Sequence, residues 1–312
     1  MMQQEESGYN EHSHSGHGHR HAPKSFGPAF AAATALNLGL VLAELVFGFL
    51  SNSLALISDG VHNFSDVLGL LLAWGGSWLA TRQPTASRTY GYRRASILAA
   101  LGNAALLFVA TGAIMIEAVR RFAEAPPVAS GMVLWVAGAA IVINSATALL
   151  FLGGRERDLN IKSAFLHMAG DAAVSLGVVI AALLIGWTGW LWLDPAVSIV
   201  IAVGILWSSW ALMREALNLA LDSVPGGIDR GAVESYLASL PDVSAVHDLH
   251  IWAMSTTETA LTVHLVRPRT EVDDRFLADT AHALEHRFSI HHATIQIETG
   301  DGECQLAPTH IV

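Results

Sequence analysis

Residues 53–74 read SLALISDGVHNFSDVLGLLLAW, and residues 164–184 read AFLHMAGDAAVSLGVVIAALL. Each apolar stretch contains a histidine followed four residues later by an aspartate: His62 with Asp66, and His167 with Asp171. In a helix, residues at this spacing lie on one face, one turn apart. An ionisable group at the centre of a bilayer costs about 2.5–3.5 kcal/mol, so four of them in membrane-length segments indicate a function.

The composition indicates an integral membrane protein with a soluble end. The chain has 312 residues, of which 52% are hydrophobic and 14% are charged, whereas soluble domains carry about 25% charged residues. The apolar runs are concentrated in residues 28–213. The single cysteine, Cys304, excludes an internal disulfide framework and is typical of a reducing compartment. The polar N-terminus lacks the apolar core of a cleavable signal peptide.

The negative charge is unevenly distributed along the chain. Residues 222–312 contain 14 acidic and 5 basic residues, a net charge of −9 out of the chain's −10. Because nucleic-acid-binding surfaces are basic, we expect no nucleic-acid partner. An acidic C-terminal segment is more compatible with cations, although acidity alone usually reflects a solvated surface.

Six apolar segments are each close to the roughly 20 residues that a bilayer requires. They cover about residues 28–50, 53–80, 95–119, 131–152, 163–186 and 194–213. If the N-terminus is cytoplasmic, the cytoplasmic segments hold ten Lys and Arg residues and the opposite side holds only Arg120 and Arg121. The positive-inside rule then predicts a multi-pass protein of the cell membrane, expected to be a bacterial inner membrane, with both termini in the cytoplasm.

The pattern changes after Arg214, where alternation typical of strands appears. We expect a small α+β domain with its helices on one face of a sheet. The predicted elements are a helix over residues 229–240, strands over 244–254 and 259–267, a helix over 272–288 and a strand over 293–299.

The two His-Asp pairs are the central candidate for a binding site. Two imidazoles and two carboxylates suit a four-coordinate divalent metal such as Zn²⁺. The alternative is a set of polar contacts between helices. Asp59, three residues before His62, and Glu44 in the first apolar segment are candidates for a second layer or an ion pathway, or for interior polar contacts. We expect Asn37 and Asn144 to be packing contacts.

Several stretches resemble the cation diffusion facilitator family. They are residues 53–74 and 164–184, YGYRRASILAALGN (90–103), DLHIWAMS (248–255) and HATIQIE (292–298). The similarity spans all but about the first 25 residues. It implies a homodimer with a six-helix transmembrane bundle and a small α+β, ferredoxin-like cytoplasmic C-terminal domain. It also implies export of a divalent metal in exchange for protons, and the paired His-Asp motifs resemble those of the zinc-preferring branch. Cd²⁺ and Co²⁺ stay possible substrates.

This resemblance also divides the chain into domains. The expected boundaries are a disordered N-terminal tail over 1–25, a transport domain over 26–215, a cytoplasmic domain over 216–300 and a C-terminal tail over 301–312. The N-terminal tail contains five histidines between residues 12 and 21, which indicates a short metal-binding tract, with an expression tag as the alternative.

The resemblance implies a second metal site in the cytoplasmic domain. Positions that bind metal in the family correspond here to His247, His264, His291 and Glu298. Histidines on an exposed sheet are the alternative interpretation, and His250 and His292 are weaker candidates.

Some family members carry an additional metal site in the loop between the second and third spans. Here that loop, TRQPTASRTYGYRRA (81–95), has no His, Asp or Glu, so we expect the site to be absent. We expect its arginines to face anionic lipid headgroups, with pairing to acidic residues of the cytoplasmic domain as the alternative.

Two other classes of function compete with transport. An intramembrane metalloprotease needs a base beside the metal, often in an H-E-x-x-H helix, and neither motif provides one. A metal-responsive sensor would need an output module, and about 90 residues of small α+β domain show none. We therefore predict a transporter and not an enzyme, with Zn²⁺ as the transported substrate, Zn²⁺ as a candidate regulatory metal, and no other cofactor. Metal ligands must be deprotonated, which gives the exchange for protons a physical basis.

Overall fold

The computed structural model describes residues 28–152, 159–268 and 274–300, together with Gly302, Cys304 and Leu306. The predicted N-terminal tail and its histidine tract lie outside the described residues. Most of the predicted C-terminal tail lies outside them too.

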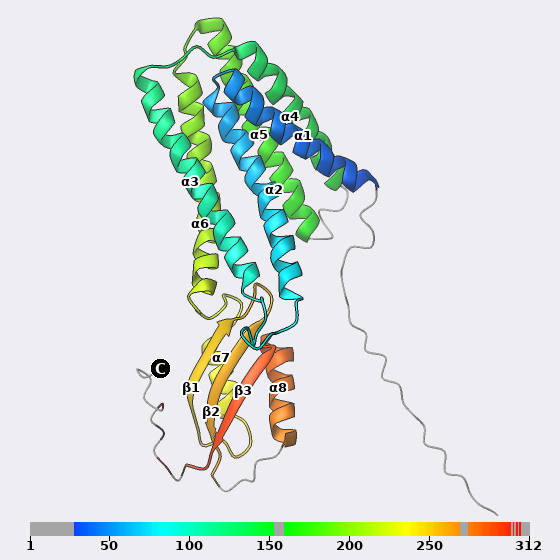
Figure 1. The fold of residues 1–312 in the computed structure, drawn as a ribbon, viewed down its shortest axis with the longest axis vertical. Coiled ribbons are helices and arrows are strands. Elements are labelled where there is room, and N and C mark those ends of the chain that lie inside the picture. The colour runs from blue at the N-terminus through cyan, green and yellow to red at the C-terminus, as the bar shows by residue number, and fades with distance from the viewer. Residues whose placement is uncertain are drawn as a thin grey trace, which may run out of the picture.

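Six long helices form one elongated bundle, and the C-terminal α+β domain lies at one end of it (Figure 1). The helices are α1 (Pro28–Leu50), α2 (Leu54–Ala80), α3 (Ala95–Ala123), α4 (Ser130–Phe151), α5 (Leu159–Thr188) and α6 (Leu193–Ala220). Among the described residues, α3, α4, α5 and α6 contain stretches that are long and apolar enough to cross a membrane. The protein is therefore a multi-pass membrane protein, and six crossings stay a prediction.

The distribution of side-chain sizes in the bundle is that of a membrane protein. Small residues are fully buried where helices meet, as at Ala118, Ala137 and Ala202, which are 0% exposed. Large apolar side chains point outward, and Trp135 and Trp207 are more than 80% exposed. Lipid removes the hydrophobic force between helices, so close packing through small residues holds a membrane bundle together.

The C-terminal domain has the predicted order of helices and strands. It consists of α7 (Arg230–Ala238), β1 (Ala245–Ala253), β2 (Thr259–Val266), α8 (Asp274–Phe288) and β3 (His292–Glu298). The strand order is β1-β2-β3, with β1 antiparallel and β3 parallel to the central β2. The parallel connection from β2 to β3 is made through α8, as a parallel pair requires.

One face of this sheet forms the core of the domain. Leu261, Val263 and Leu265 alternate along β2 and are at most 1% exposed. They pack in one cluster with Leu237 of α7 and Leu284 of α8. Because both helices use the same face, the side chains at the intervening positions of β2, including His264, project to the opposite face.

The loop between α2 and α3 connects the bundle to the C-terminal domain. Arg93 pairs with Glu258, and Arg94 Nη2 lies 2.6 Å from Asp222 Oδ1. The backbone N–H of Thr256 donates to Ser96 Oγ at 3.1 Å. The expectation that these arginines face lipid headgroups is therefore wrong for Arg93 and Arg94, whose charges are met by acidic residues at the junction of the two domains.

We expect Leu284→Ala to destabilise the C-terminal domain by about 2–5 kcal/mol, because it leaves a cavity in a fully buried core. Calorimetry of the full chain measures this change. The matched control is Glu285→Ala, at the next, exposed position of α8, which should stay within about 0.5 kcal/mol of wild type. Equal effects of the two substitutions would contradict the position of α8 against the sheet.

Candidate metal centres

The structure brings the two His-Asp pairs together, with one pair on α2 and the other on α5. His167 Nε2 lies 3.2 Å from Asp66 Oδ2, and His62 Nε2 lies 3.6 Å from Asp171 Oδ1. Within each helix, His62 Nε2 is 3.9 Å from Asp66 Oδ2, and His167 Nε2 is 3.7 Å from Asp171 Oδ2. Because the histidine and the aspartate of each pair are four residues apart, each helix contributes one His-Asp pair to the group.

These distances match those between the ligands of a tetrahedral zinc ion. Zinc binds imidazole nitrogen and carboxylate oxygen at about 2.0–2.1 Å, so neighbouring ligand atoms in a tetrahedron lie roughly 3.4 Å apart. The four distances between histidine nitrogen and aspartate oxygen run from 3.2 to 3.9 Å. Each histidine therefore lies close to both aspartates, as expected for the ligands of one divalent cation.

A cavity of about 140 Å³ leads to this group. Asp66, His167 and Asp171 line it, together with apolar side chains of α1 and α2 such as Val41 and Leu70. Asn37 and Asn144, expected as packing contacts, also line its wall.

The two further acidic residues lie close to the group and are fully buried. Glu44 on α1 and Asp59 on α2 are each 0% exposed. Asn63 Nδ2 donates to Glu44 Oε2 at 2.9 Å, and Ser175 Oγ donates to Asp59 Oδ2 at 2.9 Å. The second oxygen of each carboxyl group has no hydrogen-bond partner within the described part of the chain.

Sequence reasoning missed Asn63 and Ser175, which position these two carboxyl groups. Ser175 follows Asp171 by four residues, so helical periodicity alone places it on the face of α5 that carries His167 and Asp171. Asn63 gives no comparable signal, because its partner is on another helix.

A second cluster lies on the open face of the C-terminal sheet and depends on a β-bulge in β1. The pairing of His247 with His264 and of His250 with Thr262 leaves one extra residue on β1. Asp248 has a φ of 50° there, a left-handed conformation that aspartate tolerates better than most residues. The bulge reverses the alternation, so His247 shares the open face with His264 although Leu249 and Ile251 face the core.

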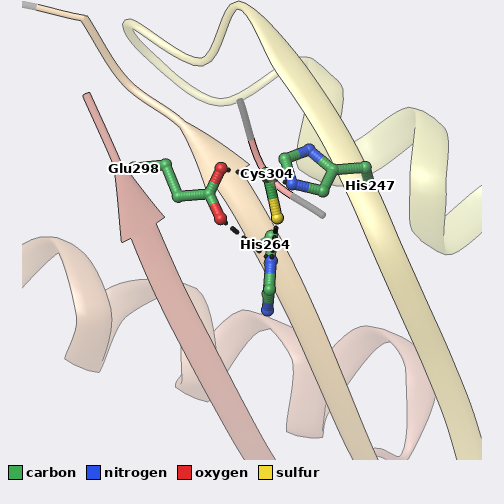
Figure 2. A group of neighbouring side chains, drawn as sticks. All are labelled: His247, His264, Glu298 and Cys304. Atoms are coloured by element: carbon green, nitrogen blue, oxygen red, sulfur yellow. Dashed lines mark hydrogen bonds and ion pairs between the residues drawn. The ribbon is translucent and has the colours of Figure 1, made fainter. Parts of the chain in front are cut away.

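Four donor groups converge at this point (Figure 2). His247 Nε2 lies 3.2 Å from Glu298 Oε2, and His264 Nδ1 lies 3.0 Å from Glu298 Oε1. Cys304 Sγ is 3.6 Å from His264 Nδ1. One donor atom from each residue lies within 4.8 Å of all the others. Two imidazoles, a carboxylate and a thiol are all ligands that zinc accepts.

The cluster differs from the predicted set in one residue: Cys304 is present, and His291 is not. His291 precedes β3 and Glu298 ends it, which separates them by about 23 Å at roughly 3.3 Å per residue. His291 Nδ1 instead accepts a hydrogen bond from the N–H of Thr259 at 3.3 Å. The prediction that His291 belongs to this metal site is therefore wrong for the arrangement within one chain. Cys304 is the single cysteine of the chain, which was the available sign of a candidate metal ligand. Its place beside the histidines could not be predicted, because it lies outside the strands.

Of the two weaker candidate ligands, His250 lies beside the cluster and His292 lies away from it. His250 Nε2 lies 2.9 Å from Asp248 Oδ1, and the other oxygen of Asp248 lies 3.4 Å from His264 Nε2. His250 therefore borders the cluster through Asp248. His292 lies at the other end of β3, where its ring makes an edge contact with Tyr90 of the α2–α3 loop.

The electrostatics of the cluster favour an ionised Glu298. Partial burial acts to raise the pKa of this carboxyl group, but the hydrogen bond from Cys304 and the neighbouring His247 and His264 outweigh it and hold the pKa below its ordinary value. At neutral pH the carboxylate is therefore charged and available to a cation.

Comparison with known families covers almost the whole described chain. A family model described as "Cation efflux transmembrane domain" matches residues 30–219, and one described as "Cation efflux protein, cytoplasmic domain" matches residues 225–300. The chain belongs to the cation diffusion facilitator family. Its members are transporters that carry out metal cation efflux, and the protein is therefore not an enzyme.

Individual facilitators are similar along nearly their full length. The metal cation efflux system protein CzcD of Cupriavidus metallidurans is 36% identical over 300 residues, 95% of this chain and 93% of that protein. The zinc transporter ZitB of Escherichia coli is 37% identical over 290 residues, 92% of each chain. A cadmium, cobalt and zinc/H⁺-K⁺ antiporter of Bacillus subtilis is 33% identical over 292 residues, 90% of this chain and 92% of that protein.

We expect His264→Ala to remove one zinc ion per chain from the C-terminal domain of this facilitator, because His264 contacts both Glu298 and Cys304. Calorimetric titration measures this in a chain that lacks residues 1–25 and carries His62→Ala and Asp66→Ala, so that other candidate sites are removed. His291→Ala is the matched control and should retain that zinc ion. Loss of zinc in His291→Ala, with binding unchanged in His264→Ala, would contradict the cluster.

Proposed function

We propose that this facilitator exports Zn²⁺ from the cytoplasm in exchange for protons, and that His62, Asp66, His167 and Asp171 bind the ion during transport. The observation that carries the proposal is the set of four nitrogen-to-oxygen distances of 3.2–3.9 Å between side chains of α2 and α5. Polar contacts between helices would need only one pair, whereas two histidines that each approach both aspartates fit a cation.

The accessibility of the site supports loading from the cytoplasm. Asp66 and His167 are about two-fifths exposed, whereas Asp171 is 6% exposed. Beyond the ligands, toward the far end of the bundle, every residue of α2 from Leu54 to Gly60 is buried. With both termini in the cytoplasm, as the distribution of basic residues favours, this conformation faces inward. On the other side of the ligands, the buried Asp59 and Ser175 close the path.

The exchange for protons follows from the chemistry of the ligands. Histidine binds metal only when neutral and aspartate only when ionised, so zinc and protons compete for the same four groups. An ordinary histidine titrates near pH 6.5, so a modest fall in pH shifts the competition toward protons. The Bacillus subtilis relative is named as a cadmium, cobalt and zinc/H⁺-K⁺ antiporter, which supports coupling to protons here.

The metal preference is supported by the donor set and by the relatives. Two imidazoles and two carboxylates suit zinc, and Cd²⁺ and Co²⁺ are further substrates because similar donors accept them. Relatives are named as transporters of zinc, or of cadmium, cobalt and zinc.

We further propose that His247, His264, Glu298 and Cys304 hold a resident zinc ion in the C-terminal domain. The donor set fits, and one donor atom of each residue lies within 4.8 Å of all the others. Such an ion would join β1, β2 and the segment after β3. The match to the cytoplasmic domain of the family supports a homodimer.

We expect Asp66→Ala to reduce zinc uptake into proteoliposomes by at least about tenfold, because the loss of one of four ligands leaves an open, weaker site. The control is Ser65→Ala, the neighbouring buried position on α2, which should transport at close to the wild-type rate. Full transport by Asp66→Ala would remove these residues from the transport site.

We expect uptake to depend on a pH gradient with the acidic side in the lumen, since protons there displace zinc from its ligands. Zinc-sensitive and pH-sensitive dyes trapped in the lumen should show zinc entering as protons leave. Addition of a protonophore should slow uptake several-fold. Equal rates with and without the gradient, and no change in luminal pH, would contradict proton exchange.

A further inference from the structure

We propose that Asp194 is a positioning residue for the transport site, which it serves by fixing the N-terminal end of α2 against α6. This inference rests on the function proposed above. Asp194 is the second residue of α6, is 2% exposed and lies at the end of the bundle away from the C-terminal domain.

Both carboxylate oxygens of Asp194 accept hydrogen bonds from the start of α2. Ser53 Oγ donates at 2.6 Å, the N–H of Leu54 at 2.7 Å and the N–H of Ala55 at 3.3 Å. Ser53 Oγ in turn accepts from the N–H of Leu56 at 3.2 Å. The first N–H groups of a helix lack partners inside the helix, and that end carries partial positive charge. A carboxylate 140 residues away in sequence from Leu54 thus completes the cap of α2.

Two other helices hold the turn that precedes α2. Arg121 Nη1, near the end of α3, donates to the carbonyl of Asn52 at 2.7 Å. The N–H of Ala129, just before α4, donates to the carbonyl of Ser51 at 3.0 Å. With Asp194 of α6, these contacts fix the start of α2 from three directions.

A tightly packed segment of α2 connects this capped end to the metal ligands. His62 lies about 12 Å along α2 from Leu54, at 1.5 Å per residue. Every residue from Leu54 to Gly60 is buried. A Cβ atom at Gly60 would lie 3.0 Å from Glu44 Cβ, so α1 packs directly on the backbone there. A rotation of α2 at its capped end is therefore carried to His62 and Asp66.

A bound zinc ion tolerates little displacement of its ligands, because the bond lengths hold within about 0.2 Å. A loose α2 would move two of the four ligands relative to His167 and Asp171 of α5. Separation of Asp194 from α2 would also leave a buried carboxylate and two N–H groups without partners, which is strongly unfavourable. We therefore expect the contact to persist through the transport cycle while other helices move.

The test compares Asp194→Ala and Asp194→Asn with Ser198→Ala in the full-length protein. Ser198 is the matched control, because it is also buried and lies one turn further along α6. Its hydroxyl donates to the backbone carbonyl of Asp194 rather than to α2. Three quantities are measured: the KM and kcat for zinc uptake, hydrogen exchange of the amides of residues 54–62, and the unfolding temperature.

We expect Asp194→Ala to raise the KM for zinc at least about fivefold and to speed amide exchange across residues 54–62. Asp194→Asn should give a smaller change, since its amide oxygen can still accept a hydrogen bond. Ser198→Ala should keep the wild-type KM and exchange. A cap that serves stability alone would lower the unfolding temperature and leave the KM of the folded protein unchanged, and that result would overturn the proposal.

Two arms keep the test decisive. If Asp194→Ala does not fold, Ser53→Ala removes the 2.6 Å bond and keeps both backbone bonds; it should raise the KM about twofold, and an unchanged KM counts against the proposal. If the wild-type protein transports no zinc, that result contradicts the proposed function and does not test the role of Asp194. Hydrogen exchange then still decides the contact, because unchanged exchange in Asp194→Asn overturns it without reference to transport.

Discussion

The close approach of α2 to α5 brings two histidines and two aspartates together, and the other helices pack around this contact. Each helix carries one histidine and one aspartate that lipid cannot solvate, and each pair finds its partners on the other helix at 3.2–3.6 Å. Elsewhere in the bundle, small residues are buried between helices and large apolar side chains lie on the outer surface. The cost of four ionisable groups in the membrane is offset only where they meet one another or a cation.

The two ends of α2 are held in different ways. At the end away from the C-terminal domain, a buried carboxylate from α6 satisfies its first N–H groups. At the other end, the loop to α3 is tied to the C-terminal domain by Arg93 with Glu258 and Arg94 with Asp222. The latter pair is about half exposed, so its contribution to stability is small. The helix that carries His62 and Asp66 therefore has one end fixed within the bundle and one end connected to the C-terminal domain.

Much of this architecture could be predicted from the sequence, because it depends on local patterns. The length of the apolar segments predicted the long helices. The alternation of apolar and polar residues after Arg214 predicted the order α-β-β-α-β of the C-terminal domain. The spacing of four residues placed each His-Asp pair on one helix face. The structural features that escaped prediction all depend on three-dimensional context. The bulge at Asp248 moves His247 to the open face, and the path beyond β3 brings Cys304 to the cluster in place of His291. The cap of α2 by Asp194 joins residues too distant for any periodicity to link.

We propose that one zinc ion is held between α2 and α5 by all four side chains. A crystal structure of the full-length protein with zinc, phased at the zinc absorption edge, would locate the ion. We expect an anomalous peak about 2.0–2.1 Å from His62, Asp66, His167 and Asp171. Peaks confined to the C-terminal domain, with the four membrane side chains bonded only to one another, would contradict it.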